Sequence, residues 1–76
     1  MEEFRTVMTE PHLQNQLKVF RAKRQLTQQE LADSIGVTRK TINVIEAGNY
    51  SPSVILALNI AKFFDTPVEE IFYLDS

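Results

Sequence analysis

A fixed spacing of small and branched residues in the middle of the chain constrains its fold more than any other feature. Counted from Gln28 as the first position, Ala32 is the fifth and Gly36 the ninth. Ile42 and Ile45 follow at the fifteenth and eighteenth positions. Alanine lets two helices cross closely, glycine accepts the left-handed conformation of a sharp turn, and the two isoleucines lock the second helix onto the first. The spacing therefore predicts two short helices joined by a tight turn.

The signals at the helix ends agree with this spacing. Thr27 and Glu30 fit a capping box, in which the Thr27 hydroxyl accepts from a first-turn N–H and the Glu30 carboxylate reaches back to the Thr27 amide. The first helix of the pair should begin there and stop at Gly36. Thr38 is a typical cap for the second helix, which Gly48 should end.

Apolar periodicity predicts further helices on both sides of this pair. Leu13, Leu17 and Phe20 recur at i, i+4 and i+7, so a helix over residues 13–24 should bury one face. A short last helix should restart after Pro67.

A longer helix is predicted after a loop that closes with a Ser51 cap and Pro52 at the first helical position. This helix should run to about Phe64. Its apolar residues are too many for one narrow stripe, so we expect a central helix that is touched on several sides. The apolar set consists of Val54, Ile55, Leu58, Ala61 and Phe64.

The whole pattern is helical, although residues 3–8 can be read as extended or helical, and no strand is convincing. Seventy-six residues with 43% apolar side chains accommodate one small domain. The predicted fold is an all-α, five-helix domain over residues 13–76, preceded by an N-terminal extension of residues 1–12.

Charge is unevenly distributed along the chain. The net charge is −2, but residues 13–64 hold seven basic and three acidic side chains, whereas residues 1–12 and 65–76 are both net acidic. A locally basic middle fits an anionic partner even though the chain as a whole is acidic. The absence of cysteine from the sequence excludes a disulfide framework, a thiol nucleophile and a thiolate zinc site.

The second helix of the central pair should expose side chains that can read DNA. A helix-turn-helix holds this helix out from the body, with its N-terminal half exposed. Arg and Lys donate to guanine acceptors or phosphates, Asn pairs with adenine, and the methyl groups of Val or Thr contact a thymine methyl. The candidates for base contacts are Thr38, Arg39, Lys40, Asn43 and Val44.

The motifs around this pair resemble those of a known family. They are Leu17-Lys18-Val19-Phe20-Arg21, Leu26 to Ala32, Gly36 to Ile42, Ile45 to Gly48, and Pro52-Ser53. Over residues 13–72 the chain resembles the Cro and phage-repressor (XRE) family of helix-turn-helix regulators, and in particular its short single-domain bacterial or phage members. The resemblance implies a lambda-repressor-like fold with the helix-turn-helix at its second and third helices. It also implies transcriptional control, more often repression.

The resemblance implies roles for individual side chains as well. Gln28 falls where the family contacts a phosphate at a helix N-terminus. Arg21 and Glu46 fall where the family pairs an arginine with a glutamate, and we assign both to structure. Base reading is implied for the exposed side chains of the second helix named above. Further phosphate contacts are implied for Thr41, Asn49, Tyr50, Ser51 and Ser53.

The two ends of the chain carry more large apolar side chains than so small a body is expected to bury. Phe64, Ile71 and Phe72 are expected to complete the core. The remainder is expected to form a homodimer interface, which would set two DNA-reading helices about 34 Å apart in successive major grooves. These interface residues are Phe63, Tyr73, Leu74, Phe4, Val7 and Met8.

Other functions are weighed against this one. His12 has no Ser, Asp or Glu at a catalytic spacing. Glu69 and Glu70 are consecutive residues, and consecutive side chains do not face each other on a helix. We therefore reject an enzyme. No cofactor, metal or small-molecule ligand is indicated, and the longest apolar run is too short to span a membrane. We expect a cytoplasmic protein whose partner is double-stranded DNA. The alternative is an antitoxin-like or adaptor module that uses the same fold to bind a protein.

Overall fold

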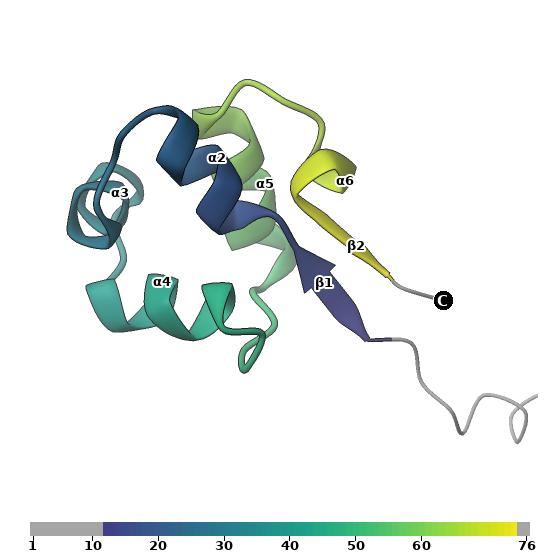
Figure 1. Ribbon diagram of the computed structural model, residues 1–76. Coiled ribbons are helices and arrows are strands. Elements are labelled where there is room, and N and C mark those ends of the chain that lie inside the picture. Colours follow the sequence, from purple (N-terminus) through teal and green to yellow (C-terminus); the bar gives the residue numbers. More distant parts are fainter. Residues whose placement is uncertain (1–11, 75–76) are drawn as a thin grey trace, which may run out of the picture.

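The computed structural model describes residues 12–74, which form five helices and two short strands (Figure 1). In chain order these are β1 (Leu13–Asn15), α2 (Leu17–Lys23), α3 (Gln28–Ile35), α4 (Arg39–Glu46), α5 (Val54–Phe63), α6 (Val68–Ile71) and β2 (Phe72–Leu74). Apart from His12, the expected N-terminal extension lies outside the described residues. No helix within residues 12–74 has the length and apolar character needed to cross a membrane.

Helices α3 and α4 form the predicted pair, and their ends carry the predicted caps. The Thr27 hydroxyl accepts from the Glu30 N–H, and the Glu30 carboxylate accepts from the Thr27 N–H at 2.8 Å. Gly36 ends α3 in the left-handed conformation, with φ at 80°. An added Cβ there would meet nothing within 4 Å, so the backbone conformation and not the available space requires glycine. The Thr38 hydroxyl caps α4 by accepting from the Thr41 N–H at 3.2 Å.

One apolar core joins the helices. Ala32, Ile42 and Ile45, which the spacing assigned to the contact between α3 and α4, are buried. Each fully buried branched side chain contributes about 1.5–3 kcal/mol relative to an exposed one. The same core contains Leu17, Leu31, Ile60, Ala61, Phe64, Ile71 and Phe72. The expectation that Phe64, Ile71 and Phe72 complete the core is therefore confirmed.

The prediction for the first helix is wrong at its start. The first three residues form strand β1, which pairs antiparallel with β2 so that Leu13 lies opposite Leu74. Helix α2 begins only at Leu17, whose N–H donates to Asn15 Oδ1 at 3.1 Å. An Asn side chain of this kind offers a backbone N–H an alternative to a helical hydrogen bond. The bond from the Leu17 N–H therefore favours a helix that starts at Leu17 and not at Leu13. The expectation that the chain has no strand is corrected at these same two places.

Helix α5 begins two residues later than predicted. Ser53, and not Ser51, caps the helix, because the Ser53 hydroxyl accepts from the Leu56 N–H at 3.1 Å. Pro52 therefore precedes the cap instead of opening the helix.

One side of α5 is apolar and uncovered, which corrects the expectation of a central helix touched on several sides. Val54, Ile55 and Leu58 are 74%, 73% and 51% exposed. Ile60 and Ala61 are buried, on the side of α5 that packs against α3 and α6. Both sides of α5 are apolar, so hydrophobicity alone does not identify the side that the core covers.

Candidate nucleic-acid interface

Helix α4 is attached by one side and exposed on the other. Ile42 and Ile45 anchor it in the core. Figure 1 shows α4 along one edge of the molecule, joined to α3 by a tight turn. Of the side chains expected to contact bases, Thr38, Arg39, Lys40 and Asn43 are exposed and Val44 is half-buried. The structure thus brings all five into one helix and its cap.

The charges at the start of α4 oppose helix stability. Arg39 and Lys40 are its first two residues, and the first turn contains no acidic side chain. The N-terminus of a helix carries a partial positive charge, so cations there are unfavourable and anions are favourable. The arrangement costs folding free energy and concentrates positive potential on an exposed surface. That combination suits contact with an anionic partner.

The end of α4 is held by an ion pair. Arg21 Nε donates to Glu46 Oε2 at 2.7 Å, and a second guanidinium nitrogen donates to Glu46 Oε1 at 3.1 Å. The side chains are 15% and 6% exposed. The hydrogen bond to Glu46 raises the pKa of Arg21, against a smaller opposing effect of burial. Arg21 also donates to the Leu26 carbonyl at 2.8 Å, so this guanidinium joins α2, the α2–α3 loop and α4.

Gln28, the first residue of α3, also contacts this pair. Its Nε2 donates to Glu46 Oε1 at 3.1 Å, and the side chain is half-buried. The side-chain amide nitrogen carries two N–H groups, so one remains for a phosphate if Glu46 keeps the other.

The hydroxyls of Thr41 and Ser53 already have intramolecular roles. Thr41 Oγ1 lies 3.0 Å from Thr38 Oγ1, within the cap of α4. The Ser53 hydroxyl accepts from the Leu56 N–H, which leaves its own O–H able to donate to a phosphate. Both residues sit beside helix N-termini, where backbone N–H groups also favour an anion.

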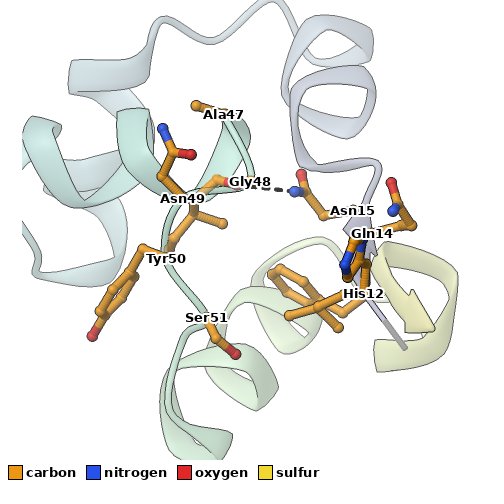
Figure 2. Close-up of a pocket in the computed structure, with 11 residues that line it drawn as sticks. His12, Gln14, Asn15, Ala47, Gly48, Asn49, Tyr50 and Ser51 are labelled. Atoms are coloured by element: carbon orange, nitrogen blue, oxygen red, sulfur yellow. Dashed lines mark hydrogen bonds between the residues drawn. The ribbon is translucent and has the colours of Figure 1, made fainter. Parts of the chain in front are cut away.

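The loop between α4 and α5 faces strand β1 across a cavity of about 690 Å³ (Figure 2). In Figure 2 the side chains of Asn49 and Tyr50 point away from the strand. Asn49, Tyr50 and Ser51 are all exposed. The residues that line the cavity include Ala47 and Gly48, immediately after α4.

Three of the residues expected to form a dimer interface, Phe63, Tyr73 and Leu74, lie within the described part of the chain. Tyr73 and Leu74 are exposed on β2. Phe63 is half-buried, and its ring packs edge-on against Phe64, with the Arg24 guanidinium 5.4 Å from the Phe63 ring centroid. Phe4, Val7 and Met8 lie outside the described residues.

Two features of this region are missed by reasoning from the sequence. One is Asn15, which links β1 to α4 through a hydrogen bond with Ile45. Its place two residues before Leu17, the first residue of α2, is the local sequence signal for it. The other is the uncovered apolar side of α5. The exposed fractions of its side chains reveal it, and the sequence contains no signal for it.

Comparison with known proteins agrees with the helix-turn-helix arrangement of α3 and α4. The helix-turn-helix family model matches residues 17–71. An uncharacterized HTH-type transcriptional regulator of Methanocaldococcus jannaschii is 52% identical over 60 residues, which cover 79% of this chain and 91% of the relative. The restriction-modification controller protein C.AhdI from Aeromonas hydrophila has a TM-score of 0.65 and 28% identity over 71% of this chain and 78% of that one. A Bacteroides fragilis protein has a TM-score of 0.72 at 23% identity, over 80% of this chain and 98% of that one, a likeness that shows the fold alone.

Proposed function

This chain belongs to the helix-turn-helix family of transcriptional regulators, and on that basis we propose that it binds a specific duplex DNA site as a homodimer and represses transcription there. Members of this family are DNA-binding regulators and not enzymes. We place its action in the cytoplasm. The observation that carries the proposal is α4, whose buried side fixes its position while two cations in its first turn face outward.

In this proposal α4 enters the major groove and reads base edges. Arg39 and Lys40 donate to guanine N7 and O6, Asn43 pairs with adenine, and Val44 contacts a thymine methyl. Thr38 reaches the edge of the site from the cap of α4. The support for these roles is the exposure of the side chains and the match between their chemistry and the donor and acceptor code of the groove.

The flanking groups bind the DNA backbone. Phosphate contacts position a protein on a duplex without carrying sequence information. We assign them to Gln28, Thr41, Asn49, Tyr50, Ser51 and Ser53. The loop residues are exposed, and the other three lie at helix N-termini where backbone N–H groups add to the side-chain donors.

The second copy of the chain is proposed to dock on the uncovered side of α5. Val54, Ile55 and Leu58 form an uncharged apolar face, and a two-fold interface brings such a face against itself. Helix α5 follows α4 in the chain, and a two-fold interface on α5 would relate two α4 helices by the symmetry that binding to successive major grooves, about 34 Å apart, requires. Tyr73 and Leu74 on β2 are the competing surface, and Phe63 is less suited because it is half-buried.

The support for repression is physical. A protein that occupies an operator can block polymerase without any activating contact, and a domain of this size is large enough for that.

The decisive experiment is selection of the purified protein against a random duplex library at physiological salt. An inverted repeat with half-site centres about ten base pairs apart is the expected product. A pool with no enriched sequence would overturn the proposal of specific DNA binding. Enrichment of a single half-site would support the proposal that α4 reads bases and would overturn the proposed homodimer.

The uncovered face of α5 also favours one alternative, an antitoxin-like or adaptor module that binds a different protein through this apolar surface. A protein that selects no DNA sequence in that experiment and is a monomer in sedimentation equilibrium would favour this alternative.

A further inference from the structure

The side chain of Asn15 joins β1 to the start of α2 and to α4, which is distant in sequence. Its Nδ2 donates to the Ile45 carbonyl at 2.9 Å, which spans thirty positions from β1 to the last turn of α4. Its Oδ1 accepts from the Leu17 N–H at 3.1 Å, at the start of α2. Figure 2 shows the first of these bonds crossing from the strand to the chain just before Gly48. Asn15 is half-buried, so the bond is partly shielded from water.

The Ile45 carbonyl is one of the groups that a helix leaves without an α-helical partner at its end. It also accepts from the Gly48 N–H at 3.0 Å, and Asn15 uses the remaining acceptor capacity of this oxygen. Asn15 therefore fixes the exit of α4 into the loop that carries Asn49 and Tyr50.

Helix α4 is only eight residues long, and the two buried isoleucines hold it along one line. Contact along one line leaves the tilt and rotation of so short a helix weakly determined. Polar links to two sides of its last turn supply the missing constraint. One runs from Glu46 to Arg21 and Gln28, and the other runs from Ile45 to Asn15.

We propose that Asn15 is a positioning residue for DNA recognition, which couples the β1–β2 sheet to the orientation of α4 and of the loop that follows it. The part of this inference that concerns DNA rests on the proposed function. The part that concerns the orientation of α4 rests on the geometry alone. Asn15 itself contacts α4 and not the base-reading side chains, so it acts through them.

The test uses the isosteric substitution Asn15→Asp. Aspartate keeps an oxygen for the Leu17 N–H but loses the N–H that Ile45 accepts, and it sets a carboxylate against a carbonyl oxygen. The matched control is Gln16→Glu, the same amide-to-carboxylate change at the next residue. Gln16 Nε2 donates to the Tyr73 hydroxyl at 2.9 Å, and that hydroxyl can donate to a glutamate instead. The control adds the same charge at the adjacent position, which separates loss of the Ile45 bond from general repulsion of DNA.

Two quantities are measured on both variants at a temperature where each is folded. The first is the ratio of affinities for the selected duplex and a scrambled one, which should fall about tenfold in Asn15→Asp and stay within about twofold in Gln16→Glu. The second is amide hydrogen exchange without DNA, which should accelerate at Gly48 and Asn49 in Asn15→Asp alone.

Equal selectivity in the two variants, with equal exchange, overturns the positioning role. If the wild-type protein prefers no duplex, the proposed function fails and the exchange measurement decides. Acceleration confined to Asn15→Asp then supports the coupling of the sheet to α4, and equal exchange refutes it.

Discussion

Arg24 lies over the rings of two adjacent phenylalanines at the end of α5, with its guanidinium carbon 5.4 Å from the Phe63 ring centroid and 5.1 Å from that of Phe64. It also donates to the Phe63 carbonyl at 3.1 Å. One side chain from the end of α2 thus covers the end of α5 and satisfies a carbonyl there. A cation–π contact at an exposed site contributes about 0.5–1 kcal/mol, so Arg24→Ala should lower the free energy of unfolding by about 1 kcal/mol, as measured by urea denaturation. Lys23, at the neighbouring position, has one ring contact, with its Nζ 5.5 Å from the Phe20 ring centroid, so Lys23→Ala should cost less. An equal loss in both variants would contradict this assignment.

The pair formed by Arg21 and Glu46 should show strong coupling. Arg21→Met leaves the Glu46 carboxylate nearly buried, with Gln28 as its one side-chain donor among residues 12–74, which should cost about 3 kcal/mol. The double variant Arg21→Met/Glu46→Leu removes the stranded charge and should recover most of that loss. Chemical denaturation of the wild type, both single variants and the double variant measures the coupling. Additive losses would show that the two side chains act independently.

Stability and DNA binding should respond in opposite directions at the start of α4. Arg39→Glu replaces a cation with an anion at a helix N-terminus and should raise the free energy of unfolding by about 0.3–1 kcal/mol. The same change should abolish binding to the selected duplex. Lys18→Glu is the matched control, because it makes the same charge reversal in the first turn of α2.

Lys18→Glu should retain DNA binding. Thermal denaturation and a DNA-binding titration of Arg39→Glu and Lys18→Glu test these expectations. If Arg39→Glu binds DNA as well as Lys18→Glu does, the assignment of Arg39 to the interface is wrong.

Two positions in left-handed backbone conformation should respond to substitution with opposite signs. Gly36→Ala introduces a Cβ at φ 80° and should cost about 1–2 kcal/mol through backbone strain, because no atom crowds the added methyl group. Gln25 already has φ at 58° with a side chain present, so Gln25→Gly should be neutral or stabilising by a few tenths of a kcal/mol. Denaturation curves of the two variants test both signs. A destabilised Gln25→Gly would show that its side-chain contacts outweigh the strain.

The surface used for self-association can be found with two charge substitutions. Ile55→Asp places a carboxylate on the uncovered side of α5, and Leu74→Asp does the same on β2; both residues are exposed, so neither change should unfold the domain. Ile55→Asp alone should produce a monomer in sedimentation equilibrium. Loss of the dimer in Leu74→Asp alone would move the interface to β2.

The sequence predicts α3 and α4 well because their signals are local. The Thr27 capping box, the left-handed Gly36 and the Thr38 cap each act within a few residues. The strands escape prediction because their pairing partners lie at opposite ends of the described chain, and nothing near Leu13 identifies Leu74 as its neighbour. For the candidate site, the helix-turn-helix spacing identifies Arg39 and Lys40, but the role of Asn15 depends on a carbonyl thirty residues away.

The pairing of β1 with β2 has a consequence for the order of folding. The helix pair α3 and α4 forms its contacts between near neighbours in the chain, whereas the strands close a loop that contains all five of the described helices. Contacts with large sequence separation slow folding when the transition state requires them. If the strands dock after the helices, substitutions in β1 and β2 will speed unfolding and leave the folding rate nearly unchanged. The lifetime of the native state would then depend on six strand residues, of which Phe72 alone belongs to the core.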